Sequence, residues 1–152
     1  MTGIAFEIET DTATAMFARL RGATDDMTPV MADIASFLES RSIDSFENQI
    51  APDGTPWQPS QAAGERGGLT LVDKARLRDS VAGFYGSDFA GVGSNLVYAR
   101  IHQLGGKAGR NQSVALPARP FLAGYEDDIS SQFGVLEIVS DYLEELASGE
   151  PG

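Results

Sequence analysis

The stretch YARIHQLGG, residues 98–106, contains His102, the one histidine of this 152-residue chain. It lies between an apolar run and two glycines, a position where a catalytic base is commonly sought. Because the chain has no cysteine, the partner of such a base would have to be a serine or threonine. The sequence has no G-x-S-x-G elbow, and the nearby Ser94 stands in an ordinary glycine turn. We therefore interpret His102 as a residue of the fold, and a His102-dependent hydrolase as the weaker alternative.

The sequence contains no recognisable metal-binding or phosphate-binding motif. A zinc site would need three carboxylates or waters beside a single histidine, which is not the usual zinc ligand set. The glycine-rich stretches GERGG and GGKAGR match neither the P-loop nor the dinucleotide motif. We expect no metal and no cofactor. Lys107 and Arg110 could still contact a phosphate backbone without sequence preference, so a small nucleic-acid-binding module using the basic region 74–110 is an alternative function.

Charge is distributed unevenly along the chain, whose formal net charge is −11. Residues 1–65 hold 11 acidic and 3 basic residues, residues 66–119 hold 3 and 8, and residues 120–152 hold 8 and none. The net acidity argues against a dedicated DNA-binding surface. Oppositely charged regions on one small chain suit copies that meet head to tail, since complementary patches fix the register of an interface. The alternative interpretation is a solvated acidic tail and a scattered basic middle.

Several classes of protein are disfavoured by simple absences in the sequence. No run of about 18 apolar residues is present, so we expect no membrane-spanning helix. The first residues, MTGIAFEIETD, have no basic region and no apolar core, so we expect no signal peptide. The lack of cysteine excludes disulfides and thiolate metal sites.

The first half of the chain predicts a strand and two helices. Residues 3–9 alternate apolar and mostly polar side chains, which is typical of a half-buried strand. Residues 10–20 predict a short capped helix. Thr28 and Pro29, as N-cap and first turn, predict the start of a long helix that ends near residue 48. Its predicted apolar face contains Met27, Val30, Met31, Ile34, Leu38, Phe46 and Ile50. The proline-rich segment 51–59, which contains the only tryptophan, Trp57, then interrupts the helix.

The middle of the chain predicts short elements joined by glycine-rich loops. Residues 60–68 and 104–112 read as flexible loops, and residues 71–80 as one or two helical turns with Leu71 and Leu77 inward. Residues 81–86 and 90–101 predict two strands, joined by a hairpin turn at Gly86-Ser87-Asp88. Residues 113–122 are expected to be extended because Pro117 and Pro120 disfavour helix in the residues before them.

The end of the chain predicts a second long helix. Glu126, Asp127 and Asp128 stand at its start, where negative charge favours the helix dipole. Its predicted apolar stripe consists of Ile129, Phe133, Leu136, Val139, Leu143 and Leu146. Residues 147–152 are expected to fray. Together the elements predict an α+β single domain over residues 1–152, with a small antiparallel sheet packed against the long central helix and the C-terminal helix.

Five stretches in a fixed order point to a known family. They are FENQIAPDGTPWQPS (46–60), LVDKARLRDSV (71–81), VGSNLVYARIHQLGG (92–106), LPARPFL (116–122) and the C-terminal helix with its acidic start. In that order and spacing they resemble the bacteriophage virion morphogenesis, or tail completion, family. The resemblance spans about residues 27–146. One departure is Lys74-Ala75, where the family commonly has Thr-Gly.

The resemblance implies a non-enzymatic structural protein of the virion, assembled in the host bacterial cytoplasm. Such proteins form rings, commonly of six copies, at the neck between the head-side connector or adaptor and the tail tube or tail terminator. DNA passes through the ring without specific binding, and the net charge of −11 fits a lumen along which DNA slides. Tryptophan, tyrosine and arginine are enriched at interface hot spots. The residues expected to anchor the fold or an interface are Trp57, Tyr98, His102, Lys107, Arg110, Arg119 and Phe121.

Overall fold

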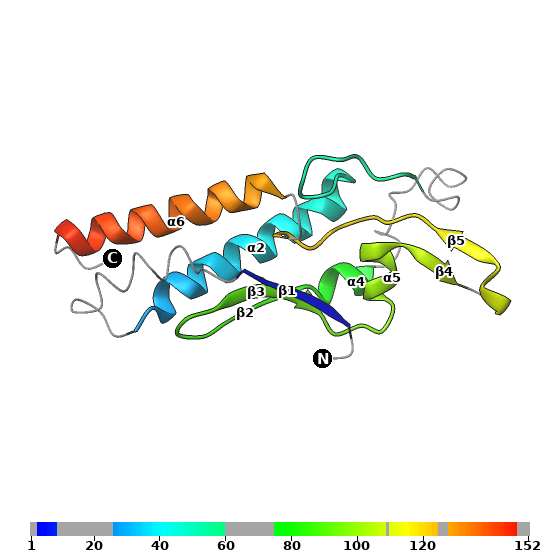
Figure 1. The fold of residues 1–152 in the computed structure, drawn as a ribbon, viewed down its shortest axis with the longest axis horizontal. Coiled ribbons are helices and arrows are strands. Elements are labelled where there is room, and N and C mark those ends of the chain that lie inside the picture. The colour runs from blue at the N-terminus through cyan, green and yellow to red at the C-terminus, as the bar shows by residue number, and fades with distance from the viewer. Residues whose placement is uncertain (1–2, 9–25, 60–74, 109, 125–127, 149–152) are drawn as a thin grey trace.

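The computed structural model describes residues 3–8, 26–59, 75–108, 110–124 and 128–148 (Figure 1). The predicted helix at 10–20, the predicted loop at 60–68, Leu71, Glu126 and Asp127 lie outside the described residues, as does the end of the chain beyond residue 148.

A small antiparallel sheet forms the base of the molecule. Strands β1 (Ile4–Ile8), β2 (Ala82–Tyr85) and β3 (Ala90–Ser94) pair in the order β1-β3-β2. The Gly86 amide donates a hydrogen bond of 2.9 Å to the Phe89 carbonyl and so closes the turn between β2 and β3. The predicted N-terminal strand and the predicted hairpin are confirmed.

Helix α2 (Thr28–Asn48) crosses this sheet and is the centre of the fold (Figure 1). Its start lies one residue from the predicted one: Thr28 is the first helical residue rather than the N-cap, and the Asp26 carboxylate accepts hydrogen bonds from the Thr28 amide and hydroxyl. Its end is as predicted, because Gln49 adopts a left-handed conformation just before the proline-rich segment. The predicted apolar face is buried, with Val30, Met31, Ile34, Leu38 and Phe46 all fully inaccessible, and only Ile50 beyond the helix is exposed.

Helix α6 (Ile129–Ser148) packs along α2 on the side away from the sheet (Figure 1). Its predicted stripe is partly wrong. Val139 is buried, as predicted, and Leu143 packs against the core, but three other members of the stripe are exposed: Ile129, Phe133 and Leu136. The buried face instead runs through Ser131, Val135 and Val139. The helix is apolar on more than one side, so spacing alone did not indicate which side faces α2.

Two short helices flank strands β2 and β3 in the sequence, one before β2 and one after β3. Helix α4 (Ala75–Asp79) buries Leu77 completely, as predicted. Helix α5 (Ala99–Leu104) corrects the prediction of one strand over 90–101, because the chain leaves β3 at Ser94 and turns into helix five residues later. A helix of six residues is too short to show a helical period, and its apolar neighbours Leu96 and Val97 made the run read as a strand.

The predicted flexible loop at 104–112 is also corrected. Strands β4 (Gly106–Ala108) and β5 (Val114–Leu116) pair antiparallel, with the short turn η2 (Arg110–Gln112) between them. We call this two-stranded hairpin, residues 106–116, the arm. It extends away from the sheet and the long helices at the end of the molecule opposite the C-terminal half of α6 (Figure 1). Glycines and polar residues predicted a loop, whereas backbone pairing makes a hairpin.

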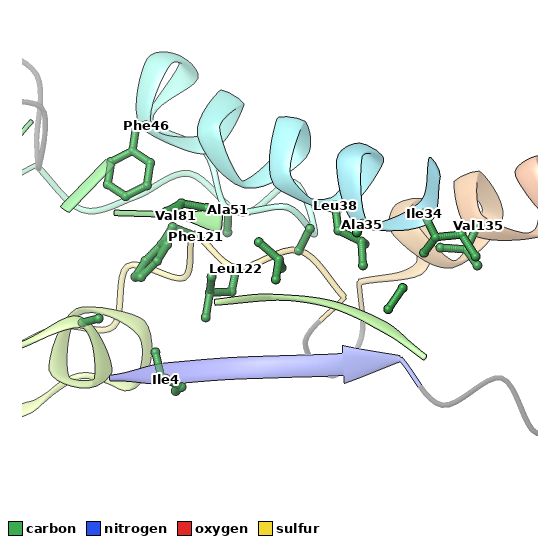
Figure 2. Close-up of a cluster of buried hydrophobic side chains, with 14 of the residues drawn as sticks. Ile4, Ile34, Ala35, Leu38, Phe46, Ala51, Val81, Phe121, Leu122 and Val135 are labelled. Atoms are coloured by element: carbon green, nitrogen blue, oxygen red, sulfur yellow. The ribbon is translucent and has the colours of Figure 1, made fainter. Parts of the chain in front are cut away.

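One hydrophobic cluster joins the layers. Figure 2 shows side chains from β1, α2, the segment 121–122 and α6 gathered in it, with Ile4, Ile34, Phe46, Phe121 and Val135 among those labelled. Close approach of the layers depends on small residues: a Cβ on Gly83 would lie 2.7 Å from the Ala35 carbonyl oxygen, so only glycine lets α2 lie this near to β2. The predicted α+β architecture, a small antiparallel sheet with two long helices, is confirmed.

Candidate assembly surfaces

His102 lies on α5, not at the end of a strand, and its side chain is 5% exposed. Its ring meets the Tyr98 ring edge-on, with 5.9 Å between the centroids. Its backbone carbonyl accepts a hydrogen bond of 2.8 Å from the Arg119 amide. Ser94, a serine that lies near His102 in the sequence, shares a hydrogen bond of 2.7 Å with the Ser80 hydroxyl and accepts one from the Leu96 amide. His102 is therefore part of the packing between α5 and its surroundings, whereas Ser94 joins the end of β3 to the residue after α4.

The segment before α6, residues 117–124, is tied to α5 by a residue that the sequence did not single out. The Gln103 side-chain oxygen accepts hydrogen bonds of 3.0 Å from both the Phe121 and the Leu122 amides. All three residues are at most 1% exposed. A buried backbone N–H without a partner is costly, and the Gln103 side-chain oxygen supplies the partner for the Phe121 and Leu122 N–H groups. Gln103 therefore holds this segment in place. Nothing in the sequence of α5 distinguishes Gln103 from a surface glutamine.

Four predicted anchors belong to the fold itself. Trp57 is 6% exposed, donates its indole N–H to the Pro120 carbonyl at 2.8 Å, and meets the Phe46 ring edge-on at 5.5 Å. Phe121 is fully buried, 5.2 Å from the Phe46 ring (Figure 2). Arg119 is 6% exposed and donates to the Gln58 carbonyl at 2.7 Å; burial lowers the pKa of its guanidinium. With His102, these residues join the proline-rich segment, α5 and the segment after the arm.

The other three anchors are accessible. Lys107 and Arg110 are exposed on the arm, and Tyr98 is 36% exposed at the start of α5. Exposed apolar side chains accompany them, with Val97 at 79% and Val114 at 49%. This end of the molecule therefore combines basic side chains with exposed apolar ones. Protein interfaces have a similar composition, with an apolar core and a polar rim.

A second apolar surface lies on α6. Ile129 is 57% exposed, Phe133 67% and Leu136 58%. Spacings of four and three place the three side chains on one side of the helix. We call these three residues the α6 patch. The sequence places these residues in one apolar stripe with Val139 and Leu143, and their spacing does not indicate that this part of the stripe is exposed.

The rotation of α6 is fixed by polar groups at its start. The Asp128 carboxylate, 1% exposed, accepts hydrogen bonds from the Ser131 amide at 3.1 Å and the Gly124 amide at 2.7 Å. From α2, Arg41 donates to the Ser131 hydroxyl at 2.9 Å and its guanidinium lies 3.7 Å from Asp128. Asp128 therefore caps the helix as well as complementing its dipole. These bonds turn Ser131 toward α2 and leave the α6 patch facing outward.

Within the described ranges, no group of three or more histidine, aspartate or glutamate side chains is placed to hold a metal ion. An open depression of about 460 Å³ lies at the end of α2, lined by Arg41, Asp44, Ser45, Asn48, Pro52 and Ser130 among others. Arg41 is already bonded there to the Pro52 carbonyl at 2.8 Å. Of the helices that the structure describes, none combines the length and apolarity needed to cross a membrane.

Comparison with known proteins identifies the family. Residues 8–144 match the phage virion morphogenesis family, and the chain belongs to it. The chain is 40% identical over 143 residues to the Mu-like prophage FluMu G protein 2 of Haemophilus influenzae, a match covering 92% of this chain and 97% of that protein. FluMu G protein 1 of the same bacterium is 27% identical over 142 residues, 88% and 92% of the two chains.

A phage protein is similar as well. The putative capsid assembly protein G of Escherichia phage Mu is 32% identical over 120 residues, which cover 68% of this chain and 77% of that protein. No solved structure matches the chain. The family resemblance predicted from the five sequence stretches is confirmed, and the chain is a phage virion morphogenesis protein.

Proposed function

We propose that the chain forms a ring at the head–tail junction of a phage particle, where it completes the neck or tail and joins the tail to the head. The observation that carries the proposal is the match to the virion morphogenesis family over residues 8–144. The partners are further copies of the chain, six to a ring, a head-side connector or adaptor protein, and a tail tube or tail terminator protein. DNA passes through the lumen without specific binding.

The surface of the subunit supports an assembly role. Exposed apolar side chains are found both on α6 and around α5 and the arm, and apolar side chains that gather in an exposed patch are typical of contact surfaces. The formal net charge of −11 repels a polyanion, which keeps DNA from adhering to a ring that it must traverse.

The proposal includes that the protein is not an enzyme. His102 is buried in packing contacts, so replacing it acts through stability. We expect His102→Ala to lower the thermal midpoint of the protein and the yield of joined particles together. A His102-dependent hydrolase predicts the opposite: a variant that folds and assembles normally but loses turnover of an ester or peptide substrate.

Disruption of the gene in the phage that encodes the chain tests the ring. We expect heads and tails to accumulate unjoined, and a plasmid copy of the chain to restore joined particles. Cryo-electron microscopy of the restored particles should show the chain as a ring at the junction. Joined, infectious particles that form without the chain, or restored particles that lack it, contradict the proposal.

A further inference from the structure

We infer that the α6 patch of one copy receives the arm of a second copy, so that neighbouring subunits interlock head to tail. The inference rests on the proposed ring and names the two surfaces that would close it. Its first support is the patch itself: Ile129, Phe133 and Leu136 are more than half exposed, while Val135 and Val139 on another side of α6 are buried against α2. Three large apolar side chains together on one exposed helix side mark a contact surface.

Charge around the patch defines what can cover it. Glu137, Asp141 and Glu144 are exposed on the following turns of α6. No basic residue is present anywhere in residues 120–152. An isologous contact between two α6 helices would bring these acidic side chains together, and like charges at an interface oppose binding. The fitting occupant is therefore apolar and basic.

The arm has that composition. No acidic residue is present in residues 89–124, and Lys107 and Arg110 are exposed on the arm together with Val114, which is 49% exposed. A two-stranded hairpin is only marginally stable without packing on one of its faces. In this arm every residue from 110 to 115 is exposed, so the described part of the subunit does not supply that packing to these residues.

The positions of the two surfaces make the contact intermolecular. The arm extends from one end of the molecule, and α6 runs toward the opposite end (Figure 1). The patch occupies the first turns of α6 and is exposed, so the arm of the same copy, which extends away from the long helices, does not cover it. A contact between two different surfaces is heterologous and closes as a ring when the rotation between copies permits.

Charge exchange in phage particles tests the inference. The arm variant carries Lys107→Glu and Arg110→Glu, the helix variant carries Glu137→Lys and Glu144→Lys, and a third protein carries all four changes. All four side chains are exposed, so each variant should fold, which its thermal midpoint checks. The matched control is Asp33→Lys with Glu47→Lys, which reverses two exposed acids on α2.

We expect the arm variant and the helix variant each to lower the yield of joined particles by at least roughly tenfold, because each places like charges at the contact. The protein with all four changes should recover most of the yield, and the α2 control should lose none. The inference is overturned if the protein with all four changes gives no higher yield of joined particles than either pair of changes. It is also overturned if only the arm variant, and not the helix variant, lowers the yield, and this variant also lowers retention of the protein on DNA.

Cysteine pairs give an independent test, because the chain has no cysteine of its own. Gln132→Cys beside the patch and Ala115→Cys on the arm change exposed residues. In oxidised particles the chain with both changes should form a ladder of covalent multimers that a reductant collapses, and chains with one change should not. Particles that contain the chain but give no ladder overturn the interlocking contact alone. Particles without the chain overturn the ring itself.

Discussion

Helices α2 and α6 have nearly the same length, 21 and 20 residues, but opposite places in the molecule. Helix α2 is enclosed between the sheet and α6, and its predicted apolar face is buried from Val30 to Phe46. Helix α6 packs on one side only and leaves Phe133 67% exposed. The difference teaches that α2 stabilises the subunit, whereas α6 divides its apolar residues between the fold and an exposed surface.

The largest expected effect is the difference in stability between two leucine-to-alanine variants, one in each helix. Leu38→Ala on α2 empties a fully buried site, so we expect the free energy of unfolding to fall by about 2–5 kcal/mol. Leu136→Ala on α6 removes a side chain that is 58% exposed, so the free energy of unfolding should change by less than about 0.5 kcal/mol. Urea titration of both variants measures the difference. Equal losses would show that the α6 patch is part of the core.

The next effect concerns the polar groups that set the rotation of α6. Asp128→Ala removes the acceptor for the Ser131 and Gly124 amides and leaves Arg41 without its carboxylate neighbour. We expect a loss of about 2 kcal/mol in the free energy of unfolding, from a missing helix cap and buried donors without partners. Ser140→Ala, on the exposed side of the same helix, is the control and should be nearly neutral. If Asp128→Ala is also neutral, packing alone orients α6.

A smaller effect separates the two sides of α2. A Cβ on Gly83 would lie 2.7 Å from the Ala35 carbonyl oxygen, and backbone moves only at a cost, so Gly83→Ala should destabilise by about 1–3 kcal/mol. A Cβ on Gly134 of α6 would meet the end of the half-buried Phe37 ring, which can turn away. Alanine also favours helix over glycine by roughly 1 kcal/mol. Thermal melts should therefore show a smaller loss for Gly134→Ala than for Gly83→Ala, and the reverse order would place the tighter contact at α6.

The smallest effect is at the exposed start of α2. The side-chain hydrogen bond from Thr28, followed by the bond from its amide, holds the pKa of Asp26 below the ordinary value of 3.8. A lowered pKa means that the charged carboxylate stabilises the fold above the unfolded value and that this stabilisation disappears as pH falls through the folded value. The difference in thermal midpoint between wild type and Asp26→Ala should therefore be present at pH 7 and shrink below about pH 4. A difference that does not change with pH would mean that the charge of Asp26 plays no part.

Much of the fold could be predicted because its main elements are long or strongly punctuated. The spacing of Val30, Ile34 and Leu38 identifies α2, and the prolines around Trp57 mark its end. The five ordered stretches were enough to indicate the family, which the match over residues 8–144 confirms. Of the predicted anchors, Trp57 and Phe121 are core residues, while a role for Lys107 and Arg110 at an interface stays a prediction.

The sequence by itself determined the N-terminal strand, the β2–β3 hairpin, the long central helix, the proline-rich break, the uneven charge and the family, because period, proline and charge are properties of neighbouring residues. The pairing of β1 with β3 was decided by the tertiary structure. Only the tertiary structure decided that His102 is on a short helix, that residues 106–116 form an arm, and that Gln103 holds the Phe121 and Leu122 amides. It also decided which side of α6 faces outward. A short element shows no full period, and the rotation of an apolar helix depends on partners such as Arg41, distant in the chain, that no local pattern contains.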